Sequence, residues 1–366
     1  MSARQTIAVV GAGIAGASLA AELARQGADD VVLLEAEDRP GYHTTGRSAA
    51  FWEECYGGPN VVPLTLASGQ WLRENGFLSP RGALYVGTDA DAPRLDEFMR
   101  TFAGSGVHIV RLGRDALADR LPGVRSGYTG AVWEPACADI DVAGLHQHYL
   151  AAARRDGVKL QTRWRVTSAM RENGRWTLRS EQGETLTADV IANAAGAWAD
   201  SFAELAGARK LGIQPLRRTV AQLRTDPLPS ADLPLVLDIA GRFYFKPESG
   251  RLWLSPHDEE PSEPCDAAPE EVAVAEAIDR FERVTDWRVV AVERKWAGLR
   301  SFAPDRLPVY GLDPKVDGLF WFAGQGGFGI QTAPAAARLG AQLLLGAPRD
   351  GMTGAINPAL YDPGRF

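Results

Sequence analysis

Hydrophobic positions near the start of the chain recur with two different periods. Residues 6–11 are a short apolar run that ends in glycine, and alanine-rich sequence with helical spacing continues to about Gln26. A second apolar run covers residues 31–35 after a short polar turn. The short runs predict buried strands, and the spacing between them predicts a helix. Together they predict a βαβ unit of about 30 residues, an arrangement typical of dinucleotide binding.

The pattern changes to short alternating runs broken by Gly and Pro over residues 78–141, and again over residues 211–302. The second of these segments contains a hairpin pattern at 242–254 and one amphipathic helix near 270–283. Alternation with period two and frequent turn residues predict an antiparallel sheet. We therefore expect the chain to visit one sheet domain twice.

Helix and buried-strand patterns return between these visits. Helical spacing at residues 143–155 precedes apolar segments at 158–164 and 176–178 and a strand at 189–193. A strand from residue 318 ends in glycines, and a helix follows at 332–345. We expect two interleaved domains, the first a nucleotide-binding domain of residues 1–77, 142–210 and 303–366, and the second an antiparallel-sheet substrate domain of residues 78–141 and 211–302.

Composition narrows the class of protein. With 366 residues, 45% of them hydrophobic and 23% charged, the chain has enough apolar surface for two globular domains. A net charge of -7 argues against nucleic-acid or anionic-membrane partners, which require clustered basic residues. The longest apolar run, residues 7–21, is shorter than the roughly 20 residues that span a bilayer. We expect a cytoplasmic protein without a transmembrane segment.

The cysteines Cys55, Cys137 and Cys265 are odd in number and widely spaced. This spacing suggests neither a metal knuckle nor a redox dithiol. We expect three reduced thiols, no metal site and no catalytic cysteine.

A glycine motif lies between the first predicted strand and helix. Glycines there permit a tight turn and bring a pyrophosphate close to the helix N-terminus. Glu35 ends the second strand, where a carboxylate accepts hydrogen bonds from an adenosine ribose. The residues expected to bind the dinucleotide here are Gly11, Gly13, Ile14, Ala15, Gly16 and Glu35.

The loop after Glu35 favours FAD over NAD as the dinucleotide. It supplies hydroxyl groups, a cation and small residues, which suit the diphosphate and the ribityl chain of FAD. The loop residues expected at the cofactor are Thr44, Thr45, Gly46, Arg47, Ser48, Ala49 and Ala50. His43 is interpreted as a surface or capping residue without a catalytic role.

A third glycine-rich segment precedes the last predicted helix. A helix N-terminus aimed at the pyrimidine edge of a flavin would stabilise the negative charge that develops there on reduction. The cofactor contacts expected from this segment are Gly326, Gly327, Gly329, Ile330, Gln331 and Thr332.

With these motifs in order, the sequence resembles the FAD-dependent D-amino-acid oxidase and dehydrogenase superfamily across nearly its whole length. Within that superfamily it most resembles the bacterial D-arginine dehydrogenases. The segments that carry the resemblance are residues 41–50, 138–141, 145–147, 214–218, 296–302 and 325–332. The resemblance implies an α/β fold of the D-amino-acid oxidase and glutathione-reductase type, with FAD held without a covalent bond. It also implies cofactor contacts at Val166, Ala195, Gly196 and Trp198.

The resemblance further implies a substrate site. Arg218 and Arg300 match the arginines that clamp a substrate carboxylate, and Tyr244 and Tyr56 match the phenols beside them. Arg217 remains an alternative to Arg218, and an exposed ion pair is the alternative for Arg300. Strand alternation would point Tyr244 away from its two phenylalanine neighbours. The positions that match the lining of the flavin and the reacting carbon are Gly298, Gly327 and Gln331.

None of these residues is an obvious general base. In the family chemistry, the free amine form of the substrate delivers hydride from Cα to flavin N5, and geometry supplies most of the acceleration. The imine then hydrolyses to a 2-oxo acid and ammonia. We accordingly expect the oxidative deamination of a D-amino acid.

The sequence departs from the D-arginine dehydrogenases at the substrate side chain. Ala83 stands where the glutamate that pairs with guanidinium is expected, and Phe51 stands in place of a histidine. Glu53 could substitute for the lost carboxylate or could be a solvated surface residue. An apolar pocket without a carboxylate disfavours a buried cation, so a neutral side chain is expected.

Other functions stay open at this stage. A 2-hydroxy-acid dehydrogenase shares the fold but normally needs a histidine base. A secondary amine oxidase of the sarcosine or glycine oxidase type fits the same clamp. A flavoprotein subunit without catalysis would not require the two clamp arginines. The electron acceptor, whether a quinone, a dye-like carrier or oxygen, cannot be read from these motifs.

Overall fold

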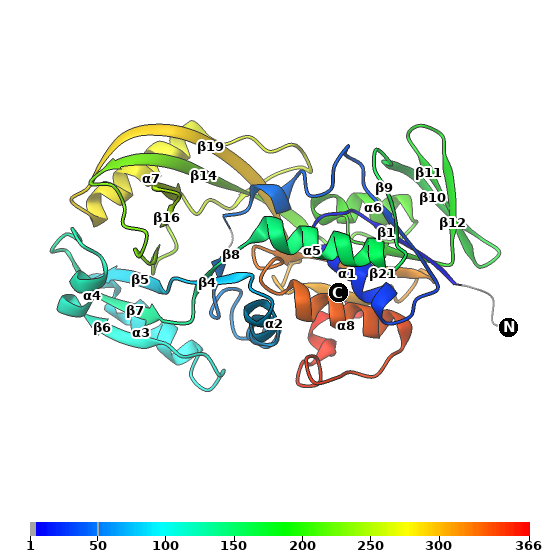
Figure 1. Ribbon diagram of the computed structural model, residues 1–366, viewed down its shortest axis with the longest axis horizontal. Coiled ribbons are helices and arrows are strands. Elements are labelled where there is room, and N and C mark those ends of the chain that lie inside the picture. The colour runs from blue at the N-terminus through cyan, green and yellow to red at the C-terminus, as the bar shows by residue number, and fades with distance from the viewer. Residues whose placement is uncertain (1–4, 50) are drawn as a thin grey trace.

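A parallel sheet forms the part of the computed structural model that contains the N-terminal motif (Figure 1). The structure describes residues 5–49 and 51–366. This sheet has the strand order β20-β21-β13-β1-β2-β9, and only β20 runs antiparallel to its neighbour. Its strands are β1 (Thr6–Val10), β2 (Asp30–Leu34), β9 (Lys159–Gln161), β13 (Val190–Asn193), β20 (Val309–Leu312) and β21 (Leu319–Ala323).

Both faces of this sheet are covered, which explains its continuous apolar runs. Ile7 and Val9 of β1 pack into one core cluster, and Ala8 and Val10 pack into another. The first cluster lies under the helices α1 (Ile14–Arg25), α2 (Val62–Glu74), α5 (Val142–Arg155) and α8 (Ala333–Leu345). The second lies under α6 (Ala199–Leu205) and the small sheet of β10 (Val166–Glu172), β11 (Arg175–Ser180) and β12 (Thr185–Ala188).

A ten-stranded, mostly antiparallel sheet lies toward the opposite end of the molecule (Figure 1). Its order is β22-β19-β14-β17-β16-β15-β5-β7-β6, and β18 pairs with β14 outside this path. Its strands are β5 (Ala83–Thr88), β6 (Val110–Gly113), β7 (Tyr128–Glu134), β14 (Gln214–Asp226), β15 (Leu235–Asp238), β16 (Tyr244–Glu248), β17 (Arg251–Ser255), β18 (Glu260–Pro261), β19 (Arg288–Phe302) and β22 (Gln325–Gly326). Three helices pack on it, α3 (Ala92–Thr101), α4 (Arg114–Arg120) and α7 (Glu271–Val284).

A short sheet joins the two halves. It has the order β3-β8-β4, with β3 (Phe51–Trp52), β4 (Leu78–Pro80) and β8 (Ala138–Ile140). The remaining turns are 3-10 helices at Thr44–Arg47, Asp89–Asp91, Gly196–Trp198, Pro358–Tyr361 and Pro363–Arg365. After β3 the chain forms α2 and β4 before it enters the antiparallel sheet at β5.

The predicted fold class is confirmed, with two corrections. Residues 78–141 contain the helices α3 and α4 besides strands, so the alternating pattern alone was an incomplete prediction there. Strand β22 belongs to residues 303–366 but pairs with β19 of the antiparallel sheet. The exact domain boundaries stay a prediction. In the ranges that the structure describes, no helix combines the length and the apolar character needed to cross a membrane.

Candidate active site

The N-terminus of α1 and Glu35 form one end of an elongated cavity. Glu35 accepts a hydrogen bond from the backbone N–H of Ala12 at 2.9 Å, which fixes its carboxylate beside the glycine turn. Burial raises the pKa of Glu35. Gly11 has a φ of 99°, and a Cβ there would lie 2.5 Å from the carbonyl oxygen of Ala194. The turn therefore requires glycine, as a close approach to a pyrophosphate demands.

The loop after Glu35 lies at the N-terminus of α1. The hydroxyl of Thr45 accepts a hydrogen bond from the backbone N–H of Ile14 at 3.0 Å, and the hydroxyl of Thr44 donates to the carbonyl of Leu299 at 2.6 Å. Ala50 lies outside the described residues. The loop thus links the first helix to β19 of the other sheet.

Arg47 lines the cavity but is not the free cation that we expected for the diphosphate. Its guanidinium forms an ion pair with Asp266 and donates to the carbonyls of Ala267 and Ala297, each at 3.2 Å. The guanidinium group of Arg47 therefore already has an ion-pair partner and two hydrogen-bond acceptors within the protein. Arg47 therefore anchors the loop on β19.

The cavity has a volume of about 520 Å³ and runs from Glu35 to the antiparallel sheet. Most of the residues singled out in the sequence line it. They are Gly11, Gly13, Ile14, Ala15, Glu35, Thr44, Thr45, Arg47, Ser48, Ala49, Phe51, Glu53, Tyr56, Val166, Ala195, Gly196, Trp198, Arg218, Tyr244, Gly298, Arg300, Gly326, Gly327, Gly329 and Ile330.

Three glycine and alanine positions lie behind the wall of the cavity. A Cβ at Gly16 would meet the carbonyl of Gly11 at 1.8 Å, and one at Gly46 would meet the carbonyl of Gly41 at 2.6 Å, so both permit backbone packing. Ala83 is fully buried in the core of the sheet. Because Ala83 does not line the cavity, the absence of a carboxylate at this position does not by itself decide which substrate side chain the cavity binds.

Gln331 and Thr332 also lie behind the wall, contrary to our expectation. The amide of Gln331 accepts from the backbone N–H of Glu53 at 3.1 Å and donates to its carbonyl at 3.0 Å. The hydroxyl of Thr332 donates to the carbonyl of Phe328 at 2.9 Å. Their polar groups are used to hold loops, and Gln331 positions Glu53 without reaching the cavity.

Arg218 and Arg300 come together at the end of the cavity opposite Glu35. Both are buried, and Nη1 of Arg300 donates to the hydroxyl of Tyr56 at 2.6 Å. Burial and the neighbouring Arg300 lower the pKa of Arg218 to about 10, so it remains charged at neutral pH. Burial opposes the charge on Arg300, but Tyr56 and Glu259 outweigh that effect and raise its pKa. Two buried cations at the end of a cavity constitute an anion site.

Arg217 is separated from this site by the alternation of β14. It contacts Asp258 at 3.4 Å and pairs with Glu270, and it does not line the cavity. Arg218 is therefore the arginine that the structure brings to Arg300.

Aromatic rings surround the two arginines. Tyr244 packs edge-on against Phe51 with ring centroids 5.6 Å apart, while Phe243 and Phe245 face the opposite core. This is the orientation that alternation predicted. Gly327 completes the wall, because a Cβ there would lie 1.8 Å from the hydroxyl of Tyr56 and 2.8 Å from Nη1 of Arg300.

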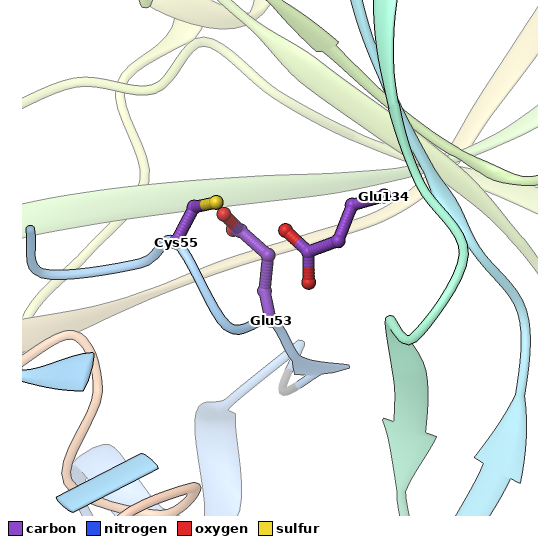
Figure 2. Close-up of side chains that lie close together, drawn as sticks. All are labelled: Glu53, Cys55 and Glu134. Atoms are coloured by element: carbon purple, nitrogen blue, oxygen red, sulfur yellow. The ribbon is translucent and has the colours of Figure 1, made fainter. Parts of the chain in front are cut away.

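Glu53 belongs to a buried acidic cluster that sequence reasoning recognised only in part (Figure 2). Its side chain, that of Cys55 and that of Glu134 point toward one another, with ligand-type atoms all within 4.8 Å. Glu134 is opposite Ala83 in the pairing of β5 with β7, and one of its carboxylate oxygens, Oε2, has no hydrogen-bond partner in the part of the chain that the structure describes. Thiolate and carboxylate groups of this kind could hold a metal ion. The expected absence of a metal site stays a prediction.

Burial determines the protonation of this cluster. Burial and the charge of Glu134 raise the pKa of Glu53 well above its ordinary value. Burial also raises the pKa of Glu134, to about 7. Burial therefore favours the neutral, protonated form of both carboxyl groups. Alternation along residues 130–134 was the available signal, because it places Glu134 on the same face as the buried Val132.

His257 lines the cavity near Tyr244 and was not foreseen. Its Nδ1 lies 3.0 Å from the carbonyl oxygen of Gly241, so this nitrogen carries the proton and donates. Burial, together with Arg218 and Arg300, lowers the pKa of His257 to about 2. The imidazole is neutral at physiological pH and is a poor proton acceptor. Its position depends on the loop after β17, which no motif marks.

Known proteins resemble the chain over nearly its whole length. It matches the family model of FAD dependent oxidoreductases (DAO) over residues 6–343. It is 25% identical over 420 residues to FAD-dependent oxidoreductase domain-containing protein 1 of Xenopus laevis, covering 99% of this chain and 83% of that protein.

Two solved structures share the fold. Glycine oxidase from Geobacillus kaustophilus superposes with a TM-score of 0.84 at 23% identity, covering 99% of both chains. L-proline dehydrogenase from P. horikoshii has a TM-score of 0.84 at 21% identity, covering 99% of this chain and 98% of that one. A glycine turn, a buried carboxylate and a long cavity between the sheets fit FAD, and the chain belongs to the FAD dependent oxidoreductase family.

Proposed function

We propose that this protein oxidises the Cα–N bond of a small amino acid. The observation that carries the proposal is the convergence of Arg218, Arg300 and Tyr56 at the end of the FAD cavity opposite Glu35. A planar guanidinium binds both oxygens of a carboxylate, so this end would hold the carboxyl group of the substrate. The substrate would then lie with Cα toward the part of the cavity lined by Gly298 and Gly327.

Bound FAD supplies the acceptor for the hydride that leaves Cα. The nitrogen lone pair forms the C=N bond, and water then converts the imine into a 2-oxo acid and ammonia. The protein residues orient the substrate: the arginines fix the carboxylate, and Phe51 and Tyr244 exclude water beside it.

The finer parts of this proposal are a D configuration and a primary amine. They rest on the resemblance of Arg218, Arg300, Tyr244 and Tyr56 to the clamp of D-amino-acid dehydrogenases. A second candidate is a glycine, a secondary amine or an imino acid. The names of glycine oxidase and L-proline dehydrogenase, both similar in fold, favour it.

Oxidation of a 2-hydroxy acid fits the cavity less well. That reaction needs a base to remove the hydroxyl proton. Phe51 offers none, and the pKa of about 2 leaves His257 with little capacity to accept a proton.

Anaerobic mixing of the purified holoenzyme with single candidate substrates tests the proposal. The panel contains D- and L-alanine, D- and L-norleucine, glycine, sarcosine, L-proline and D-lactate. Bleaching of the flavin absorbance by one of the amines, with D-lactate inert, is expected. Reduction by D-lactate alone would instead identify a hydroxy-acid dehydrogenase.

A further inference from the structure

Glu259, which does not line the cavity, forms ion pairs with both Arg300 and Arg218. It lies in the short segment between β17 and β18, and its Oε1 accepts from Nη2 of Arg300 at 2.7 Å and from Nη2 of Arg218 at 3.4 Å. Arg306 binds the same carboxylate, with Nη2 at 2.9 Å from Oε1 and 3.0 Å from Oε2. One internal carboxylate therefore bridges both arginines of the proposed clamp.

The hydrogen bonds of Arg300 show what a substrate would have to change. Nη1 binds Tyr56 and Nη2 binds Glu259, while the buried Nε has no partner in residues 5–49 and 51–366. A carboxylate binds a guanidinium with two parallel bonds, either to Nε and Nη2 or to Nη1 and Nη2. Both arrangements use Nη2. Nη2 carries one N–H group toward each edge, and Glu259 already accepts from one of them, so a carboxylate that binds the same edge must displace Glu259.

Charge and exposure favour such an exchange. Arg218 and Arg300 are buried like charges, and a carboxylate relieves their repulsion whether it belongs to Glu259 or to a ligand. The side chain of Glu259 is 35% exposed and that of Arg306 is 52% exposed. Glu259 can therefore move outward while Arg306 retains it, without leaving an unpaired charge in the interior.

We propose that Glu259 is a built-in competitor for the carboxylate site. It occupies the clamp when no substrate is bound, and the carboxylate of the substrate displaces it from Arg300 and Arg218 toward Arg306. The inference rests on the clamp of the proposed function and assigns Glu259 no part in the oxidation. It predicts that affinity for carboxylates is set partly by a residue outside the cavity lining.

Titration of the holoenzyme with acetate tests this inference, because acetate carries the carboxylate but cannot be oxidised at a Cα–N bond. Binding is followed by the perturbation of the flavin spectrum. Glu259→Gln should lower the acetate Kd by about tenfold, since the apparent Kd equals the intrinsic Kd divided by the fraction of sites that are free of the competitor. Arg306→Met should raise the Kd, because Glu259 then has only the clamp as a partner.

Glu260→Gln is the matched control. It removes the same charge one residue away, and Glu260, which is exposed on β18, forms no ion pair or side-chain hydrogen bond in the described residues. An unchanged Kd in this variant is expected. If Glu259→Gln weakened acetate binding or changed it no more than Glu260→Gln, Glu259 would be a support for the arginines and the inference would be wrong.

The acetate assay is independent of turnover. If no amino acid reduces the flavin but Glu259→Gln tightens acetate binding, the proposed function fails and the competitor role stands. If amino acids reduce the flavin and acetate binding does not tighten, only the competitor role fails. For an amino acid that the enzyme oxidises, Glu259→Gln should change KM more than kcat.

Discussion

At the scale of single residues, the carboxylate clamp makes the clearest prediction. Arg300→Met or Arg218→Met removes one of the two buried guanidinium groups, and with it the charged hydrogen bonds to the substrate carboxylate. We expect kcat/KM for the oxidised amino acid to fall by about 2 kcal/mol or more, ~30-fold, with FAD still bound. Steady-state kinetics and the flavin spectrum measure the two effects separately.

Arg217→Met is the control for that prediction. Arg217 is adjacent in sequence, carries the same charge and pairs with Glu270 outside the cavity. Its loss should change kcat/KM little. Equal losses in Arg217→Met and Arg218→Met would place the substrate carboxylate elsewhere.

Glu134 gives a prediction about stability. Its pKa of about 7 in the folded chain lies above the ordinary 4.5, so folding favours the protonated acid. The stabilisation is complete below about pH 4.5 and is lost as the pH rises through about 7. Glu134→Gln keeps an acceptor for the backbone N–H of Glu54 and cannot ionise.

Thermal unfolding from pH 5 to pH 9 measures that effect. The Tm of Glu134→Gln should match the wild type at pH 5 and exceed it by a few degrees at pH 9. Parallel Tm curves would contradict a raised pKa for this carboxyl group.

The sequence pointed to Glu35 through its place at the end of a predicted strand, and to Arg218 and Arg300 through the resemblance of their segments to the D-amino-acid dehydrogenases. It did not identify Glu134, His257 or Glu259. Glu134 reaches the cluster through the register of β7 on β5, and His257 and Glu259 reach the arginines through one loop. Such contacts depend on how distant segments pack.

At the scale of elements, periodicity located the strands and helices of the parallel sheet closely. The helix α3 was missed although its apolar residues do share one face, where Leu95 is buried and Phe98 and Met99 are partly buried against the same core. The approach to it also carried a signal, since Thr88 and Asp91 form a capping box on the 3-10 helix that leads into α3, and Pro93 lies in the first turn of α3. Local capping chemistry was more informative there than hydrophobic alternation.

The glycine-rich segment before α8 supports a prediction at this scale. A Cβ at Gly327 would overlap the hydroxyl of Tyr56, so Gly327→Ala must displace that phenol from Arg300 or shift the segment. We expect a higher KM for the amino acid and a higher Kd for acetate. Gly351→Ala is the control, because nothing lies within 4 Å of the added methyl group. Unaltered binding in Gly327→Ala would show that the Tyr56 contact is not part of the site.

At the scale of the whole molecule, the active site exists only because two sheets meet. Thr44 bonds to Leu299 across 255 residues, and the indole N–H of Trp296 donates to the carbonyl of Arg47 at 2.9 Å. The interleaved order of segments could be predicted because hydrophobic patterns typical of the nucleotide-binding domain and of the antiparallel sheet alternate along the chain. The cavity between them could not, because no local pattern specifies the long pairing of β14 with β19 that carries both clamp arginines.

The choice of substrate side chain follows from where the acidic cluster lies relative to this cavity. Glu53 lines it, and burial and the neighbouring Glu134 raise its pKa well above the ordinary value, which favours the neutral acid. A neutral side chain should therefore be preferred below pH 7, since a buried cation without a carboxylate is costly. As the pH rises and the cluster ionises, a cationic side chain should gain.

The measurement is the ratio of kcat/KM for D-lysine to that for D-norleucine between pH 6 and pH 9. Titration of the substrate α-amine affects both substrates alike and largely cancels in the ratio, while the lysine side chain stays cationic over most of this range. We expect the ratio to lie below one at pH 6 and to rise with pH in the wild type. Glu53→Gln removes the ionisable group at the cavity wall, so its ratio should stay low throughout. A flat ratio in the wild type, or the same rise in Glu53→Gln, would mean that the substrate side chain lies away from the cluster.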